Sequence, residues 1–245
     1  MSGKAFFGAG LPRLDTAELG GTLIVVEGTD GVGRSTQIDE LKKWLEVGGH
    51  AVVTTGWARS PLMQESIEHA KAGHSLNVHT LSLLYLADFA DRLENQVVPA
   101  LRAGFVVLAD RYFYTALARA IVRGADRDWI RGAYGFALVP DAVFYMRIGI
   151  EDLIPRAISA QTLTDRYWTG GGGEGMDYWE AGMDLRLGED VYDSWVEYQR
   201  RILAEFDQMT AEFAFRVVDA SKSYKATSAE LKAGISQLLG APRDG

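Results

Sequence analysis

The sequence predicts an α/β fold in which a five-stranded parallel sheet is flanked by helices. Two observations predict it. Five short apolar runs rich in β-branched residues recur along the 245 residues, and stretches with helical spacing separate them. The runs do not alternate between apolar and polar residues, so both faces of each strand should be buried, as in a parallel sheet. Regular alternation of strands and helices then favours a doubly wound arrangement with right-handed crossovers.

The expected strands are the five apolar runs at 22–26, 51–55, 105–109, 142–146 and 215–218. The expected helices are the periodic stretches at about 62–72, 78–103, 113–123, 127–138, 151–160, 191–213 and 228–239. We expect residues 1–20 to form an N-terminal extension and residues 21–240 to form one domain. Residues from about 156 to 190 include a run of glycines at 170–175, which is typical of a mobile loop. This segment is either a tolerated surface insertion or a lid over a site.

Composition excludes several classes of protein. The chain is 47% hydrophobic and 24% charged, which is typical of a globular protein. It has no cysteine, which excludes disulfides, thiolate zinc sites and cysteine nucleophiles. The net charge of −8 argues against sequence-independent binding to nucleic acid or anionic membranes. Without an apolar run of about 20 residues or a secretory signal pattern, we expect a cytoplasmic protein.

The segment after the first strand has the pattern of a phosphate-binding loop, G-x-x-x-x-G-[K→R]-S. Its members are Gly28, Thr29, Asp30, Gly31, Val32, Gly33, Arg34, Ser35 and Thr36. The glycines let the backbone curl so that successive N–H groups point at phosphate oxygens, and the helix that begins near Ser35 adds its positive dipole end. Arg34 stands where the motif has lysine; it keeps the charge but is planar and bulkier. Either the loop is retuned, or it binds nucleotide without catalysis.

Together with this loop, later motifs resemble the thymidylate kinase family of P-loop nucleoside monophosphate kinases. The loop is similar to the family's E-G-x-D-G-x-G-K-[ST]-T-Q. The other motifs follow in the family's order: Asp110-Arg111-Tyr112 resembles D-R-[YFH], Val139-Pro140-Asp141 resembles R-P-D, Arg156 with Asp165-Arg166-Tyr167 resembles the R…D-R of the lid, and Val217-Val218-Asp219-Ala220 resembles the strand before the adenine-side loop. The resemblance covers about residues 21–240 and implies the three-layer P-loop NTPase fold.

The resemblance implies transfer of the ATP γ-phosphoryl group to a nucleoside monophosphate, with Mg²⁺, by a homodimer. Arg34 would neutralise the β- and γ-phosphates, and Arg111 would hold the acceptor phosphate. Asp30 would contact the acceptor sugar or the metal shell, and Arg156 and Arg166 would reach the transferring group from the lid. An acid at the end of the third strand, Asp110, can hold Mg²⁺ close to the hydroxyl of Ser35.

The acceptor pocket departs from the family pattern F-x-x-x-R, in which an aromatic ring stacks on the base and an arginine reads its edge. Tyr85 matches the aromatic residue, but Phe89 occupies the arginine position, and Arg92 is one turn onward. After Asp110-Arg111, the segment from Thr115 to Ala120 lacks the polar groups of the family's S-S-x-A-Y-Q.

Three arginines are candidates for contacts to the acceptor. Arg119 and Arg123 either replace the lost base-reading groups or lie on a solvated helix face. Arg59, after the second strand, could contact a phosphate. We therefore expect acceptor contacts from Asp30, Arg59, Tyr85, Phe89, Arg92, Arg111 and Thr115.

The sequence favours a kinase that phosphorylates dTMP. One alternative is a kinase of the same fold with a different or modified acceptor, because Phe89 and Ala120 stand where polar groups are expected. Another is a regulatory nucleotide-binding protein that has lost transfer, because Arg34 replaces lysine. We expect ATP and a nucleoside monophosphate as ligands, and no polymeric nucleic acid or membrane as a partner.

Overall fold

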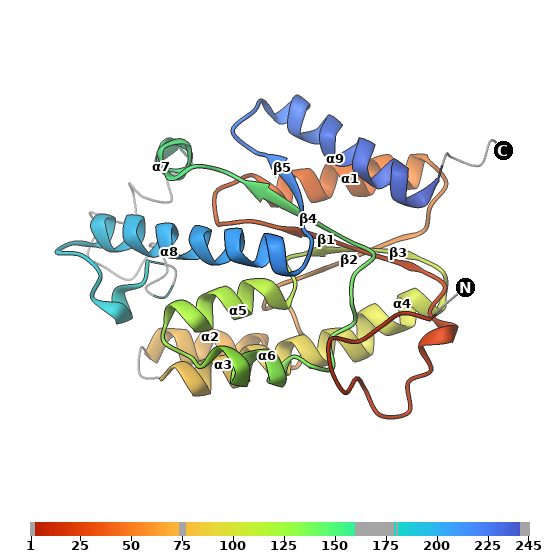
Figure 1. Ribbon diagram of the computed structural model, residues 1–245, viewed down its shortest axis with the longest axis horizontal. Helices are drawn as coiled ribbons and strands as arrows, with labels where there is room; N and C mark the ends of the chain where they lie inside the picture. Colours follow the sequence, from red (N-terminus) through yellow and green to blue (C-terminus); the bar gives the residue numbers. More distant parts are fainter. Residues whose placement is uncertain (1–2, 74–76, 160–178, 180, 241–245) are drawn as a thin grey trace.

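The computed structural model describes residues 3–73, 77–159, 179 and 181–240. At its centre, five parallel strands form one sheet in the order β2-β3-β1-β4-β5 (Figure 1). The strands are β1 (Thr22–Glu27), β2 (Val52–Gly56), β3 (Val106–Asp110), β4 (Ala142–Arg147) and β5 (Arg216–Asp219). Each lies within one residue of the apolar run that predicted it, so the predicted parallel sheet is confirmed.

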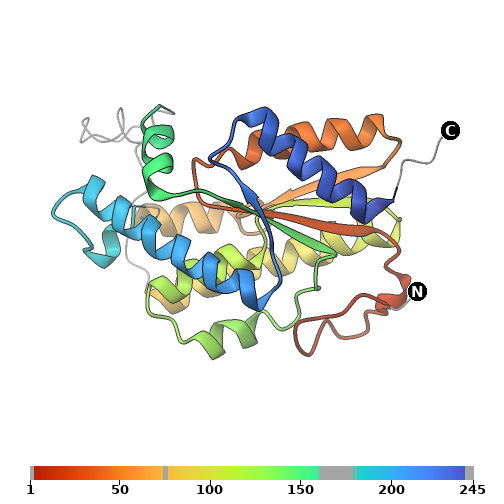
Figure 2. The ribbon, with the colours of Figure 1, turned by 45° about the horizontal axis from the view of Figure 1, so that its top comes forward.

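Helices cover both faces of the sheet. They are α1 (Arg34–Val47), α2 (Gln64–Gly73), α3 (Val78–Arg92), α4 (Val98–Arg102), α5 (Phe113–Val122), α6 (Arg127–Ala133), α7 (Ile150–Ser159), α8 (Val191–Glu212) and α9 (Tyr224–Leu239). Figures 1 and 2 show α1 and α9 on one face and α3, α4, α5 and α8 on the other. An apolar cluster fills each interface, so the molecule has the expected three layers.

The long helix expected at 78–103 is interrupted. The structure has a π turn, η2 (Leu93–Val97), between α3 and α4. Pro99 in the first turn of α4 has no N–H to donate, and its ring would clash with the carbonyl of Asn95 in an uninterrupted α-helix. The local widening of the helix accommodates the proline.

The last helix begins earlier than expected. Ser223 is its N-cap, and the Ser223 hydroxyl accepts a hydrogen bond from the N–H of Ala226 at 3.4 Å. Short helical turns also occur at η1 (Thr16–Glu18) and η3 (Met183–Leu185). Within the described parts of the chain, every helix is too short or too polar to cross a membrane.

The strand order determines where a ligand site lies on the sheet. β1 lies between β3 and β4; the chain forms β2 and β3 on one side of β1 and then β4 and β5 on the other. At such a reversal the loops after neighbouring strands diverge, and ligands bind at the carboxyl ends of the strands. Val26 of β1 is in register with Asp110 of β3. The loop at 28–36 and the segment after Asp110 therefore leave the sheet side by side.

Candidate active site

The loop at 28–36 connects β1 to the first turn of α1. Gly31 and Gly33 have φ values of 78° and 91°, which are left-handed conformations that favour glycine. Gly33 is also the N-cap of α1, without a side-chain cap, so the first N–H groups of the helix stay available to a ligand. Such a curled backbone at a helix N-terminus can bind phosphate.

Arg34 is folded back against this loop. Its Nη1 donates hydrogen bonds to the carbonyl oxygens of Gly28 at 2.7 Å and Thr29 at 3.1 Å, and its Nε donates to Asp110 Oδ1. The hydroxyl of Ser35 donates to Asp110 Oδ2 at 3.0 Å. Burial alone would raise the pKa of Asp110, but Arg34 and Ser35 outweigh it and hold this pKa below its ordinary value. The structure therefore brings Arg34, Ser35 and an ionised Asp110 together.

The residues at this point fit a magnesium ion that is shared with phosphates. The hydroxyl of Ser35 and the carboxylate of Asp110 are the hard oxygen ligands that Mg²⁺ prefers. In the residues that the structure describes, no group of three or more His, Asp or Glu side chains could hold a metal by itself. A cation here would take its remaining ligands from water and from a bound nucleotide.

Asp30 is clamped by two arginines. Its carboxylate pairs with Nη2 of Arg111 and, at 2.8 Å, with Nη2 of Arg119 from α5. Burial disfavours the charged carboxylate, but Arg111 and Arg119 overcome this effect and lower the pKa of Asp30. The pairs fix both guanidinium groups beside the phosphate loop, where they can meet an anionic ligand.

Arg111 has a constrained backbone. Its φ of 69° is uncommon for a residue other than glycine, and its N–H donates to the carbonyl of Val26 at 3.0 Å. The left-handed conformation turns the chain sharply at the end of β3. Only 5% of Arg111 is exposed, next to the loop.

Glu27 was not expected from the sequence to belong to the site. It is fully buried, and it accepts hydrogen bonds from the N–H of Tyr112 at 2.8 Å and the hydroxyl of Thr115 at 2.7 Å. Burial raises the pKa of Glu27. Thr115 is thus held between Glu27 and Nη1 of Arg111, which is 3.4 Å away. The sequence signal for this buried hydrogen-bonding role of Glu27 was a charged residue at the end of an apolar strand.

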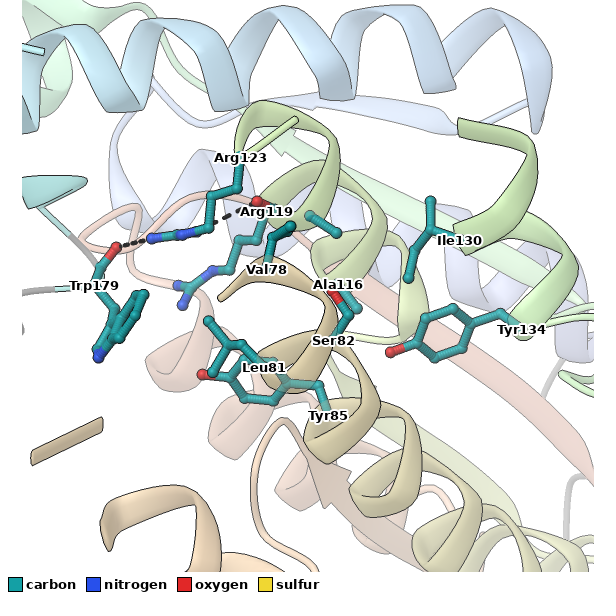
Figure 3. A pocket seen from close by; sticks show the side chains of 11 residues that line it. Val78, Leu81, Ser82, Tyr85, Ala116, Arg119, Arg123, Ile130, Tyr134 and Trp179 are labelled. Atoms are coloured by element: carbon teal, nitrogen blue, oxygen red, sulfur yellow. Dashed lines mark hydrogen bonds between the residues drawn. The ribbon is translucent and has the colours of Figure 1, made fainter. Parts of the chain in front are cut away.

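A pocket lies between α3 and α5. Its walls come from α3, α5, α6 and the residue at 179: Val78, Leu81, Ser82, Tyr85, Ala116, Arg119, Ala120, Arg123, Ile130, Tyr134 and Trp179 (Figure 3). Tyr85 therefore lies where the aromatic residue was expected. The ring of Trp57 lies 4.3 Å from that of Tyr85 between centroids, so Trp57 packs against this residue of the pocket wall.

Of the expected acceptor residues, Tyr85 alone lines this pocket, and two of the others, Phe89 and Arg92, are held in the core. Phe89 is 2% exposed and packs edge-on against Tyr112 in the core. Arg92 is 1% exposed, and its Nε donates to Asp88 at 2.9 Å. Since its Nη1 reaches Thr55 on β2 at 3.4 Å, Arg92 is tied into the core and does not replace the family's arginine in the pocket wall.

Arg119 is buried and the side chain of Arg123 is 4% exposed, so the interpretation of a solvated helix face is wrong. Arg123, the C-cap of α5, is bound by Asp184 at 2.9 Å, by the hydroxyl of Tyr198 at 2.6 Å and by the carbonyl of Trp179. It therefore joins α5 to the segment that leads into α8. Sequence periodicity missed this because α8 buries the outer face of α5.

Other expected residues lie around the loop. Arg59 is mostly exposed, with Nη2 4.0 Å from Asp110 Oδ2. Nη1 of Arg156, from α7, donates to the carbonyl of Val32 at 3.3 Å. A second hollow is bordered by Arg156, Gly33 and Thr36 on one side and by the segment after β5 on the other. Arg166 and most of the expected lid, 160–178 and 180, lie outside the described residues.

Comparisons with known proteins point to one family. The family model for thymidylate kinase matches residues 26–166. A probable thymidylate kinase 2 of Saccharolobus solfataricus is 35% identical over 222 residues, which cover 90% of this chain and 96% of that protein. The thymidylate kinase of Akkermansia muciniphila is 35% identical over 58% of this chain and 69% of its own length. The thymidylate kinase of Bifidobacterium longum is 29% identical over 90% of this chain and all of its own length.

The fold and the site define a P-loop phosphotransferase of the nucleoside monophosphate kinase class. The chain belongs to the thymidylate kinase family.

Proposed function

We propose that this protein transfers the γ-phosphoryl group of ATP to dTMP, which yields dTDP and ADP. The arrangement of Asp30 carries the proposal. Its two arginine partners bridge the space between the phosphate loop and the pocket at Tyr85. An acceptor whose base lies beside Tyr85 would present its phosphate to Arg111, close to the donor phosphates.

The donor side of the site consists of the loop and α1. Backbone N–H groups from Gly31 to Ser35 would bind the β- and γ-phosphates. Arg34 would exchange its hydrogen bonds with the carbonyls of Gly28 and Thr29 for bonds to phosphate oxygens. Ser35 and Asp110 would hold Mg²⁺, which would neutralise phosphate charge and orient the γ-phosphoryl group.

On the acceptor side, Arg111 would orient the phosphate of dTMP so that one of its oxygens attacks the γ-phosphorus while the bond to the β-phosphate oxygen breaks. Asp30 holds Arg111 in place. Arg156 would neutralise charge on the transferred group, with Arg166 as a further contributor. Phosphoryl transfer depends on position and charge, and one arginine at the transition state can contribute about 10³-fold or more.

The acceptor contacts expected from Arg59, Thr115, Phe89 and Arg92 have unequal support. Arg59 is exposed beside Asp110, and this position supports a contact to a phosphate. Thr115 accepts a hydrogen bond from Arg111 and so helps to hold this arginine in place. Phe89 and Arg92 are held in the core and would act only indirectly, through the packing of α3. A cytoplasmic location and a homodimer remain predictions.

A coupled assay of ADP release tests the proposal with dTMP, dUMP, dCMP, dGMP and dAMP as acceptors. We expect the highest kcat/KM with dTMP and little release without an acceptor. A preference for another monophosphate would support the alternative of a different acceptor. ATP binding by calorimetry, with ADP release at the no-acceptor rate for all five, would overturn the kinase and indicate a regulatory protein.

A further inference from the structure

Tyr134 follows the last turn of α6 and belongs to the wall of the pocket. Its ring stacks on Phe113 with centroids 5.4 Å apart and meets Phe89 edge-on at the same separation. Only 1% of the residue is exposed. Figure 3 shows its hydroxyl pointing into the pocket, towards the side of α3 that carries Ser82.

The hydroxyl of Tyr134 is buried and has no hydrogen-bond partner among the described residues. Burying a hydroxyl without a partner destabilises the fold, and a phenylalanine would make the same aromatic contacts without that cost. Nearby Tyr112 shows the usual arrangement, because its hydroxyl donates to the carbonyl of Leu138 at 3.1 Å. Packing therefore accounts for the ring of Tyr134 but not for its hydroxyl.

The remaining walls of the pocket offer few polar groups to a base. Ala116 and Ala120 form the α5 side. The two arginines in the wall are held elsewhere, Arg119 by Asp30 and Arg123 by Asp184. A base in an apolar wall with unpaired carbonyl or N–H groups would be bound poorly. Ser82 also brings a hydroxyl to this wall, but among the described wall residues Tyr134 is the one whose buried side-chain polar atom has no partner, so its hydroxyl can pair with the base.

We propose that the Tyr134 hydroxyl is a base-binding group that hydrogen-bonds the polar edge of the acceptor base. This inference rests on the proposed function, because it places the base beside Tyr85. A phenol can donate to a carbonyl oxygen and accept from a ring N–H, and both groups lie on one edge of thymine. The fitting acceptor is a pyrimidine monophosphate with such an edge, and an isostere that lacks polar groups is not bound in the same way.

Tyr134→Phe tests this assignment with a matched control, Tyr145→Phe. The hydroxyl of Tyr145 is also buried without a partner among the described residues, but it packs against Phe206 and lies away from the pocket. KM and kcat are measured for dTMP and for the monophosphate of 2,4-difluorotoluene deoxyriboside, a thymine isostere with fluorines in place of the carbonyls. The melting temperature without ligand is measured for all three proteins.

We expect KM for dTMP to rise about tenfold in Tyr134→Phe, which corresponds to 1.4 kcal/mol, while KM for ATP and for the isostere changes less than twofold. Both variants should melt at or above the wild-type temperature, and Tyr145→Phe should keep the wild-type KM. An unchanged KM for dTMP in Tyr134→Phe, or an equal rise for dTMP and the isostere, would overturn the assignment. If wild type itself fails to phosphorylate dTMP, the proposed function fails, which is a separate result.

Discussion

Replacing Arg34 with lysine gives the loop its usual residue, yet the structure predicts that this change is harmful. The guanidinium of Arg34 spans three acceptors at once: the carbonyls of Gly28 and Thr29 and the carboxylate of Asp110. A lysine ammonium is a single point with a shorter reach and cannot bridge all three. Arg34→Lys should therefore leave buried acceptors of the loop partly unpaired.

The magnitude follows from the bonds that are lost. A hydrogen bond to a charged group contributes about 1.5–3 kcal/mol and a neutral one about 1 kcal/mol. Since lysine can keep some of these hydrogen bonds, we expect Arg34→Lys to lower the free energy of unfolding by about 2 kcal/mol. For a chain of this size, that corresponds to a fall of about 4–8 °C in melting temperature.

Urea unfolding and the ADP-release assay measure both consequences. We expect kcat/KM for ATP to fall about tenfold in Arg34→Lys, because the loop no longer holds its phosphate-binding curl. Arg201→Lys is the matched control, since Arg201 forms an exposed pair with Glu197 on α8 and should change stability by less than about 0.5 kcal/mol. If Arg34→Lys is as stable as wild type and turns over faster, the reasoning is refuted and Arg34 is a weakened substitute for lysine.

The remaining predictions concern the clamp, α5 and the pocket. Asp30→Asn should lower the free energy of unfolding by about 2 kcal/mol at pH 7, because two buried arginines lose an ionised partner. Burial opposes ionisation, but the arginines lower the pKa of Asp30, so this stabilisation is complete above its ordinary value of 3.8 and is lost as the pH falls further. Urea unfolding between pH 7 and pH 3 should show the wild-type advantage shrinking only below about pH 4. Arg123→Met should lower the melting temperature by about 6 °C in calorimetry, because the bonds to Asp184 and Tyr198 are removed. Tyr85→Ala should raise KM for dTMP about tenfold and leave KM for ATP within twofold, because the aromatic face is lost.

Each of these predictions has an outcome that contradicts it. A wild-type advantage over Asp30→Asn that is constant from pH 7 to pH 3 would show that the charge of Asp30 contributes nothing. Arg147→Met, which breaks an exposed pair with Asp207, is the control for Arg123→Met, and equal melting shifts in the two variants would contradict a buried anchor at α5. Parallel rises of both KM values in Tyr85→Ala would indicate general damage to the fold.

The sheet and the phosphate loop could be predicted from the sequence because their signals are local. Apolar β-branched runs mark strands that are buried on both faces, and glycine spacing marks a loop whose backbone must adopt left-handed conformations at Gly31 and Gly33. The interruption at 93–97 also has a local cause in Pro99, although helical periodicity continues through it.

The acceptor side could not be predicted in the same way, because it depends on contacts between distant segments. From the sequence, Arg119 and Arg123 have the pattern of exposed charges on a helix. Their pairs with Asp30 and Asp184 form only when distant segments pack against α5. Arg92 has the right spacing to replace the family's arginine, but its pair with Asp88 holds it in the core. The hydroxyl of Tyr134 carries no sequence signal, because only the assembled pocket shows that it lacks a partner.

The most direct test of the proposed reaction is to identify its products. Wild-type protein is incubated with ATP, Mg²⁺ and dTMP, and the nucleotides are separated by ion-exchange chromatography over time. The account predicts that dTDP and ADP appear in equal amounts and that neither forms when dTMP is left out. ADP without dTDP, or no ADP at all while ATP is bound, would contradict it.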